Sequence, residues 1–514
     1  MKNTRTFRLN TLSFMIMMAM TSPALPNPTQ GQVVAGQAQI QQSGNVLTVN
    51  TGSQKTIIDW NSFSIAPGET TRFNQPSSSA SVLNRVLSSE PSSILGSLQS
   101  NGKVFLINPY GILVGAGANI NVAGFVASTL NISNQDFLQD RFNFHASGST
   151  AAVRNDGGIE TPAGGSVYLL GSAVENKGLI TAPNGEVLLA AGETISLIDT
   201  GTPGVRIDVS AAPGKTLNLG KIVASAGTIG LAGALIQNEG ELNASSVVQE
   251  GGRIFLKAQA NATGQSAAII HAGQVKADSE LANGGSIEFQ ADNVLLAGST
   301  TASGADGGQI NVQGAQQVLQ TRGSTLQTDG ANTGGRVVVQ SSDGVVFSSG
   351  DIQSNGNTGG QIDMLGKHVV LNGAQLSATG ANLGGTVRVG GDYQGNNPDV
   401  QNADTVAVNE TSRINTSATQ QGDGGKTIVW AEERTEFVGS IKAEGGALSG
   451  NGGFVEVSAK ETLAFQGTVS TNAPNGENGT LLLDPKNLTI GEAASGAPVF
   501  LRLLDGPEGA GDLF

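Results

Sequence analysis

Apolar and polar positions alternate along most of this chain in short runs that are separated by glycine-rich corners. From residue 284 onward a Gly-Gly pair repeatedly precedes such a run. The copies begin at Gly284-Gly285-Ser-Ile-Glu-Phe, Gly307-Gly308-Gln-Ile-Asn-Val, Gly334-Gly335-Arg-Val-Val-Val, Gly359-Gly360-Gln-Ile-Asp-Met and Gly384-Gly385-Thr-Val-Arg-Val, with looser copies at Gly424-Gly425 and Gly452-Gly453. The first five lie about 23 to 27 residues apart, and alternation with a period of two predicts strands rather than helices.

An Asn-x-Gly marker appears earlier, between residues 155 and 240. It occurs four times, as Asn155-Asp-Gly157, Asn176-Lys-Gly178, Asn218-Leu-Gly220 and Asn238-Glu-Gly240. The spacings are about 21, about 42 and about 20 residues, which we interpret as one, two and one turns of a single repeat with the copy near Leu197 missing. A repeat of this length with short strands is typical of a solenoid.

The pattern predicts an all-β fold, a right-handed single-stranded parallel β-helix with an N-terminal β cap. Coils that stack at ~4.8 Å would align inward side chains such as Ile287 and Phe289 into apolar columns. Glycine supplies the conformations that tight corners require, and stacked asparagine amides can hydrogen-bond along the axis. About 20 coils would make a rod on the order of 100 Å long. A β-propeller needs longer repeats, and disorder would not pair glycines with Val-x-Val strands at a steady interval.

The segment from Val33 to Phe144 has a less regular pattern and is the expected cap. Expected strands are Val46–Val49, Thr56–Trp60, Val104–Ile107 and Ile120–Ala127, and expected short helices are Pro91–Leu98 and a helix capped by Ser133 ahead of Asp136. A cap is needed because an uncovered first coil would expose an open edge.

One turn interrupts the apolar run from Val104 to Thr129. Asn108, Pro109 and Gly111 occupy the positions that a type I turn favours, with Tyr110 between them. The turn is expected to join a strand ending at Ile107 to one beginning at Ile112.

Composition and charge restrict the function classes. Charged residues make up 13% of the 514, and 73 are glycine, yet 38% are hydrophobic, which is a poor match to disorder. The net charge of −14 argues against a nucleic-acid partner, because phosphate binding needs a basic face.

The N-terminus has the pattern of a secretory signal peptide. Lys2, Arg5 and Arg8 precede an apolar core from Leu12 to Met20, and cleavage is expected after Ala24. That core is well short of the ~20 residues a membrane span needs, so no transmembrane span is expected. There is no cysteine, which suits a chain that must stay threadable through a pore.

No catalytic, cofactor-binding or metal site is predicted. His145, His271 and His368 are far apart in sequence, and thiolate chemistry is impossible without cysteine. The run Gly115-Ala-Gly117 is an incomplete dinucleotide fingerprint with no helix after it. The acidic residues are scattered, unlike the calcium-binding clusters of β-helical polysaccharide lyases, so the chain is not expected to be an enzyme.

Three stretches carry a resemblance to a known family: "TIIDWNSFSIAPGETTRFNQPSSSASVLNRV", "ILGSLQSNGKVFLINPYGILVGAGANINVAGFVAST" and "NISNQDFLQDRFNF". They resemble the N-terminal secretion domain, also called the haemagglutination activity domain, of filamentous-haemagglutinin-type exoproteins, which belong to two-partner secretion systems of Gram-negative bacteria. Asn108-Pro109-Tyr110-Gly111-Ile112 corresponds to the family's Asn-Pro-Asn-Gly-Ile secretion motif, with Tyr110 in place of the usual Asn, and the second family tetrapeptide, Asn-Pro-Asn-Leu, is absent. The resemblance implies export through the periplasm by an Omp85-type outer-membrane transporter with POTRA domains, to the medium or the cell surface.

The resemblance suggests a division of the chain. Residues 1–24 are the expected signal peptide, 25–200 the secretion domain with its cap, 201–490 the β-helix repeat region and 491–514 a C-terminal tail. The segment "GTLLLDPKNLTI" also occurs in this class, where longer chains usually follow. The chain is therefore either a short exoprotein or the front end of an interrupted reading frame.

An adhesin is the leading functional hypothesis, because a rod of this kind holds binding loops away from the cell. Its host or surface receptor is not encoded by any general pattern. The alternatives are an exoprotein that binds haem or a haem carrier, the shaft of a contact-dependent toxin and, more distantly, a β-helical polysaccharide lyase.

Overall fold

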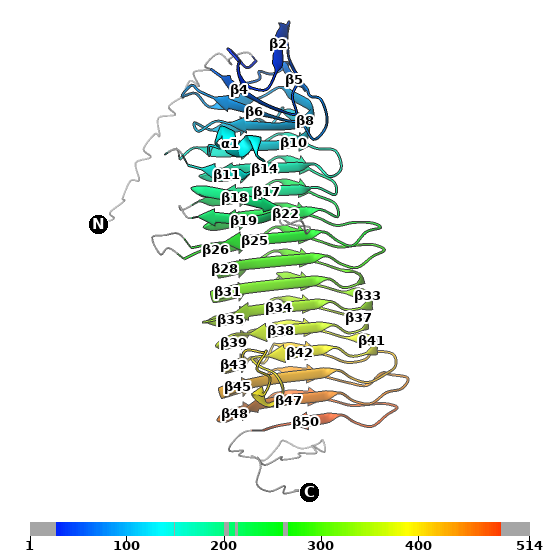
Figure 1. The fold of residues 1–514 in the computed structure, drawn as a ribbon. Helices are drawn as coiled ribbons and strands as arrows, with labels where there is room; N and C mark the ends of the chain where they lie inside the picture. The colour runs from blue at the N-terminus through cyan, green and yellow to red at the C-terminus, as the bar shows by residue number, and fades with distance from the viewer. Residues whose placement is uncertain are drawn as a thin grey trace, which may run out of the picture.

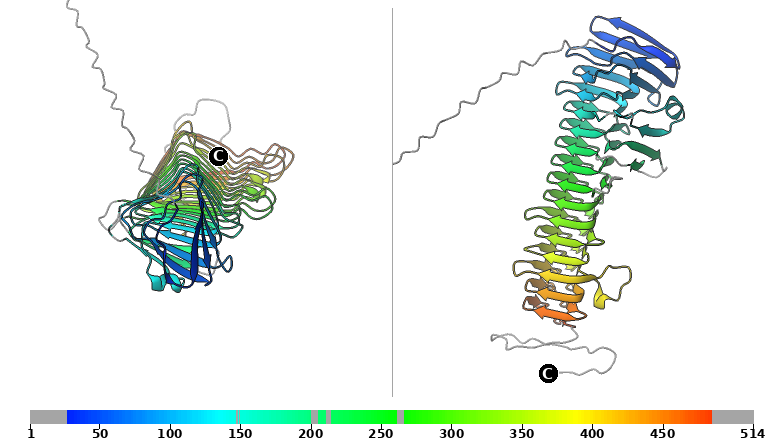
Figure 2. Two further views of the ribbon diagram at one scale, coloured as in Figure 1. Left: turned by 90° about the horizontal axis from the view of Figure 1, so that it is seen from above. Right: turned by 90° about the vertical axis from the view of Figure 1, so that its left-hand side faces the viewer.

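The computed structural model describes residues 27–146, 148, 150–199, 205–210, 214–260 and 266–484, which form a straight rod. The chain winds from the N-terminal end of the rod to the C-terminal end, and the view along the axis shows a roughly triangular outline (Figures 1 and 2). The signal peptide predicted over residues 1–24 and the tail predicted over residues 491–514 lie outside the described residues.

Parallel strands stack into three faces, and most coils contribute one strand to each. Some long strands turn a corner and serve two faces. Face A consists of β4 (Lys55–Trp60), β6 (Ser81–Val86), β8 (Ser97–Ile107), β10 (Asn119–Ser128), β14 (Ser166–Gly171), β17 (Glu186–Ala191), β22 (Thr228–Gly233), β25 (Arg253–Ala258), β28 (Ser286–Leu296), β31 (Gln309–Gln320), β34 (Arg336–Ser341), β38 (Gln361–Leu365), β42 (Thr386–Val389), β45 (Lys426–Phe437), β47 (Phe454–Ala459) and β50 (Thr480–Leu482).

Face B follows face A along the chain and shares β28, β31 and β45 with it. Its other strands are β7 (Ser92–Ile94), β9 (Ile112–Val114), β12 (Ala152–Asn155), β15 (Ala173–Asn176), β20 (Lys215–Asn218), β23 (Leu235–Asn238), β26 (Ala268–His271), β35 (Val345–Ser348), β39 (His368–Leu371), β43 (Ala403–Val408) and β48 (Thr462–Phe465).

Face C completes each coil and shares β8 and β10 with face A. Its other strands are β3 (Val46–Thr51), β5 (Thr70–Asn74), β13 (Gly158–Glu160), β16 (Leu179–Thr181), β21 (Lys221–Val223), β24 (Glu241–Asn243), β27 (Gln274–Lys276), β29 (Ser299–Thr301), β32 (Thr325–Gln327), β36 (Asp351–Gln353), β40 (Gln375–Ser377), β44 (Arg413–Asn415), β46 (Ser440–Lys442) and β49 (Thr468–Ser470).

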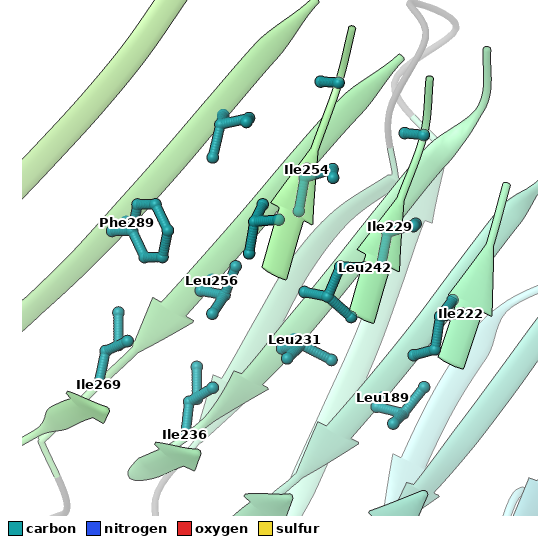
Figure 3. Close-up of a cluster of buried hydrophobic side chains, with 14 of the residues drawn as sticks. Leu189, Ile222, Ile229, Leu231, Ile236, Leu242, Ile254, Leu256, Ile269 and Phe289 are labelled. Atoms are coloured by element: carbon teal, nitrogen blue, oxygen red, sulfur yellow. The ribbon is translucent and has the colours of Figure 1, made fainter. Parts of the chain in front are cut away.

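The core is one apolar column that runs through the middle of the rod. Ile254 and Leu256 point inward from one coil, and Ile287 and Phe289 occupy the same positions on the next. Figure 3 shows Ile254, Leu256 and Phe289 among the inward-pointing side chains of successive coils. Because the backbone of each inner strand bonds to a strand on either side, each coil depends on its neighbours for burial and for hydrogen bonds. The predicted fold class, a parallel β-helix with an N-terminal cap, is confirmed.

Antiparallel strands cap the N-terminal end. β1 (Gln32–Ala35) pairs with β4, and β2 (Ala38–Ser43) forms a hairpin with β3. Beneath them the rings of Trp60 and Phe63 meet edge to face at 5.8 Å, which closes the core where the stack begins.

A small second layer covers the N-terminal part of face A. It consists of α1 (Asn134–Leu138) and an antiparallel sheet of β11 (Phe142–His145), β18 (Thr194–Asp199) and β19 (Val205–Ser210). Phe137 and Phe144 pack into a second apolar cluster with outward residues of the coils, such as Leu188. The expected helix capped by Ser133 is confirmed, since the Ser133 hydroxyl accepts the Asp136 N–H. Figure 2 shows this layer on one side of the rod.

A ridge of longer corner loops runs down the edge between faces C and A. Four of these loops form their own parallel sheet, made of β30 (Gly304–Asp306), β33 (Gly330–Thr333), β37 (Gly356–Thr358) and β41 (Gly380–Leu383). A different insertion follows β42 and contains the short 3-10 helix η1 (Tyr393–Gly395).

The helix expected over Pro91–Leu98 is wrong. The segment forms β7 and the start of β8, with a corner at Gly96 between them. Ser92 and Ile94 pair with Ile112 and Val114 of the next coil, so backbone pairing to a neighbour overrides the local helix signal. A side chain at Gly96 would lie 2.4 Å from the Ala66 carbonyl oxygen, so only glycine fits this corner.

The interpretation of the 42-residue spacing as two coils is also wrong. β15 pairs directly with β20, and Asn176 lies opposite Asn218 on adjacent coils. The extra residues leave the coil as the β18–β19 hairpin and return at Gly214, whose added Cβ would be 2.5 Å from the Ala191 carbonyl oxygen.

Among the described residues, insertions of this kind lower the number of coils that a given length of chain forms. Face A contains sixteen stacked strands from β4 to β50. At ~4.8 Å per coil these sixteen strands extend about 75 Å along the axis.

Candidate secretion turn and asparagine ladder

Asn108 organises the turn that lies between β8 and β9. Its side chain is fully buried, and its amide nitrogen donates to the Glu90 carbonyl oxygen and the Ser92 hydroxyl, both at 3.0 Å. Its side-chain oxygen accepts the Tyr110 N–H at 3.0 Å, and its carbonyl accepts the Gly111 N–H at 3.1 Å. The side-chain nitrogen of Asn108 therefore ties the turn to the preceding coil, and its side-chain oxygen closes the turn itself.

The other residues of the turn divide into buried and exposed positions. Ile112 is buried at the start of β9, and Gly111 has φ +120°, a conformation that side chains disfavour. Pro109 is half-buried, while the Tyr110 side chain is 54% exposed. The Tyr110 side chain is not needed to form the turn, which explains how tyrosine is accommodated here.

Face B carries a buried ladder of four asparagines. Their side-chain nitrogens donate to the oxygen of the next coil, from Asn155 to Asn176, Asn176 to Asn218 and Asn218 to Asn238, each at 2.8 Å. All four are fully buried, so the amides satisfy one another where water is excluded. The structure thus brings together in one column the residues that the sequence placed in one repeat.

The glycines of the same marker form a second column at the adjacent corner. Each follows its asparagine by two residues, and a Cβ on Gly178, Gly220 or Gly240 would lie 2.0–2.3 Å from the carbonyl oxygen of the glycine one coil earlier. Gly157 begins the column, and its N–H donates to the Asn155 side chain. The Asn-x-Gly marker therefore combines a ladder position with a corner that admits no side chain.

His271 ends the ladder, and sequence reasoning did not assign it this place. Its Nδ1 lies 3.2 Å from the Asn238 side-chain nitrogen, and its Nε2 lies 3.3 Å from the Ser299 carbonyl oxygen. Burial lowers the pKa of His271 to about 4, so the ring is neutral at pH 7 and accepts through Nδ1 while donating through Nε2. The sequence did hold a signal for this position. His271 follows Asn238 by the length of one coil that has a longer corner loop, so the two residues take equivalent positions on adjacent coils.

The other two histidines lie apart from this column. His145 is exposed on β11, and His368 is exposed on β39, where its Nδ1 lies 2.8 Å from the Thr405 hydroxyl. Among the described residues no three His, Asp or Glu side chains are grouped closely enough to hold a metal ion. No helix in the described part of the chain has the length and apolar character of a membrane span.

A family model of the TPS secretion domain matches residues 24–277. The match contains the turn from Asn108 to Gly111, the second layer over face A, the asparagine ladder and His271. The boundary expected at residue 200 stays a prediction.

Curated relatives match a shorter part of the chain. Two heme/hemopexin-binding proteins of Haemophilus influenzae are similar, one at 32% identity over 36% of this chain and the other at 34% over 27%. The matches cover 22% and 15% of those proteins, so the chain spans about a fifth of the length of the relatives it matches.

Two solved structures are also similar. The HMW1 secretion domain from Haemophilus influenzae covers 89% of this chain and 100% of its own length at 27% identity, with a TM-score of 0.44. The filamentous hemagglutinin secretion domain covers 55% of this chain and 93% of its own at 18% identity, with a TM-score of 0.31.

The fold and the matched domain define a class, the β-helical proteins that carry their own secretion domain at the N-terminal end. Within that class the chain belongs to the exoproteins of two-partner secretion. The matched secretion domain indicates a secreted exoprotein of a Gram-negative bacterium.

Proposed function

We propose that the chain is an adhesin whose secretion turn is recognised by the transporter before the coils form. The observation that carries this proposal is the combination of a secretion domain with a stack of at least sixteen coils in one chain. The secretion domain supplies the export signal, and the stack supplies a rigid support for receptor-binding side chains.

Recognition requires an unfolded turn, because in the folded chain Asn108 is buried and its hydrogen bonds are used internally. Before folding, the strands around it offer unpaired backbone groups, which a POTRA sheet edge of an Omp85-type transporter could pair with by β-augmentation. Coil-by-coil folding outside then hinders return and needs no nucleotide at the outer membrane.

The export step is tested by co-expressing the chain with its transporter and measuring secreted protein. Asn108→Ala is expected to lower the secreted yield by about tenfold or more, because the unfolded turn loses the side chain that the transporter is proposed to recognise. On folding, the exported turn also loses hydrogen bonds to two residues of the preceding coil and one of its own. Tyr110→Ala is the matched variant in the same turn, and its exposed side chain predicts near-normal yield. Equal yield from Asn108→Ala and wild type would refute the assigned role.

The adhesin proposal is tested with bacteria that display the exported chain. Attachment to epithelial cell layers is expected to fall to background when the gene is deleted and to return when the chain and transporter are supplied together. Unchanged attachment of the deletion strain would contradict this function while leaving the export assignment intact.

Binding of a haem carrier is the second candidate, favoured by the names of the two curated relatives. A carrier protein is a better candidate ligand than bare haem, because His271 is buried and the two exposed histidines lie on separate elements. Immobilised secreted chain should retain haem-loaded hemopexin from a purified solution. Failure to retain it, together with normal haem-limited growth of a deletion strain, would exclude this candidate.

A further inference from the structure

A polar trough lies on the rod at the corner between faces A and B, between β25 and β34. Lys257, Gln290, Gln313 and Gln340 stand in register on four successive coils and form one wall. The small residues Ala258, Ala291 and Gly314 follow them and form the floor. The trough encloses about 490 Å³ and runs parallel to the rod axis for about 14 Å, or three coil spacings.

Raised elements border this part of the rod. Towards the N-terminus, β19 packs against β22, which precedes β25 on face A. Towards the C-terminus, Gln401 from the insertion after β42 accepts from Gln340 at 2.8 Å and donates to the Ser341 and Ser342 carbonyl oxygens. Neither β19 nor the insertion after β42 covers the coils that lie between these two elements.

The wall offers amide groups that the protein does not use. The side chains of Gln290 and Gln313 make no hydrogen bond to any described residue, and they are spaced by one coil. Each amide can donate and accept at once, which matches neighbouring hydroxyl groups. The spacing of ~4.8 Å is comparable to one sugar unit in an extended glycan.

The two charged side chains that line the trough already have partners within the protein. Lys257 Nζ lies 3.2 Å from Glu288 Oε1, and Asp292 Oδ2 accepts the Ala267 N–H at 2.7 Å. A free anion-binding group is therefore lacking among the described lining residues, and the net charge of −14 also disfavours an acidic ligand.

A peptide strand is a poorer occupant than a glycan. The backbones of β28 and β31 pair with strands on both sides, so these coils offer no free edge for β-augmentation. A ligand of the trough must therefore bind to the side-chain amides and must lie along the rod axis.

We propose that this trough binds a linear, uncharged glycan of about three to four sugar units. The inference deepens the proposed adhesin function, on which it rests, by naming the chemical class of the receptor. The amide column would bind hydroxyl groups of successive sugars while the small residues on the floor allow the chain of rings to approach the backbone.

The experiment applies the purified secreted chain to an array of neutral, sialylated and sulfated oligosaccharides and then measures affinity for the best neutral tetrasaccharide by calorimetry. We expect binding to neutral linear glycans, with affinity rising from monosaccharide to tetrasaccharide. The double variant Gln290→Ala with Gln313→Ala should bind about tenfold more weakly or worse, the effect of losing two hydrogen bonds. The control double variant, Gln274→Ala with Gln353→Ala on face C, should bind as wild type.

Folding is checked independently, because both double variants should be secreted and melt like wild type. Absence of neutral-glycan binding, preference for acidic glycans, or equal affinity of the trough variant and wild type would each overturn the proposal. If bacteria still attach to cells while the trough variant attaches equally well, the adhesin function stands and the trough fails. If the trough binds glycan but the bacteria do not attach, the adhesin function fails and the trough stands.

Discussion

Four buried asparagines and one histidine form a hydrogen-bonded chain with a single direction along face B. Each asparagine donates towards the C-terminus, and Asn155 also accepts the Gly157 N–H at the start. A buried amide without a partner costs about 1–3 kcal/mol, so each coil is stabilised only when the next coil supplies its acceptor. Neutral His271 ends this series of hydrogen bonds, because Nδ1 accepts from Asn238 and Nε2 donates to the Ser299 carbonyl oxygen.

The buried histidine makes stability depend on pH in a defined range. His271 has a pKa near 4 when folded and 6.5 when exposed, so the unfolded chain binds more protons between these values. Its contribution is fully present above pH 6.5 and is lost as the pH falls towards 4, by about 3 kcal/mol. Denaturant unfolding at pH 7 and pH 4.5 measures this loss.

His271→Asn is the matched variant, because asparagine can accept from Asn238 without titrating. Glu456, whose pKa burial raises to about 7, changes stability in the opposite direction, so the comparison uses the difference between variant and wild type. The variant should show a smaller loss on acidification than wild type. An identical pH dependence in both proteins would show that His271 does not titrate as the structure indicates.

Individual strands could be predicted from the sequence where glycine markers also showed the corners of the coil on which they lie. Ile287 and Phe289 follow a Gly-Gly pair, which marks the corner in the sequence. The structure requires glycine at this corner, because a Cβ on Gly285 would lie 2.1 Å from the Gly252 carbonyl oxygen. The segment Pro91–Leu98 failed because its strand depends on pairing with β9, which lies later in the chain. The trough could not be predicted, since its wall depends on the register of four coils.

The β18–β19 hairpin is an insertion that the coil does not need. Gly171 pairs with Ala191, and Ala173 pairs with Lys215, so Gly214 occupies the place that Ser172 has one coil earlier. Deleting residues 192–213 should leave a closed coil with the Asn176–Asn218 bond intact. It should also expose the second apolar cluster, because β18 supplies Ile195 and Leu197 to it.

The expected result of the deletion is an unchanged β-type circular dichroism spectrum with increased binding of an apolar dye and a lower melting temperature. Each aliphatic side chain that loses its burial contributes about 1.5–3 kcal/mol, which sets the scale of the destabilisation. Loss of the β spectrum would mean that the hairpin is part of the coil after all.

At the scale of the whole molecule, stability is a sum over neighbouring coils, so a break in the middle divides the rod. Gly285 lies at such a point, where an added Cβ would be 2.1 Å from the Gly252 carbonyl oxygen of the previous coil. Gly285→Ala must push β25 and β28 apart, and the loss of their pairing leaves two shorter stacks. Hydrogen exchange should accelerate in β25 and β28 and stay slow in β14 and β47.

Gly158→Ala is the control, since its Cβ would be 3.8 Å from the nearest atom and its backbone is not in the left-handed region. Its exchange should match wild type in every coil. If Gly285→Ala instead accelerated exchange uniformly along the rod, unfolding would be a single cooperative event. Neighbouring coils would then share stability over the full stack rather than pair by pair, and the additive description of this solenoid would have to be replaced.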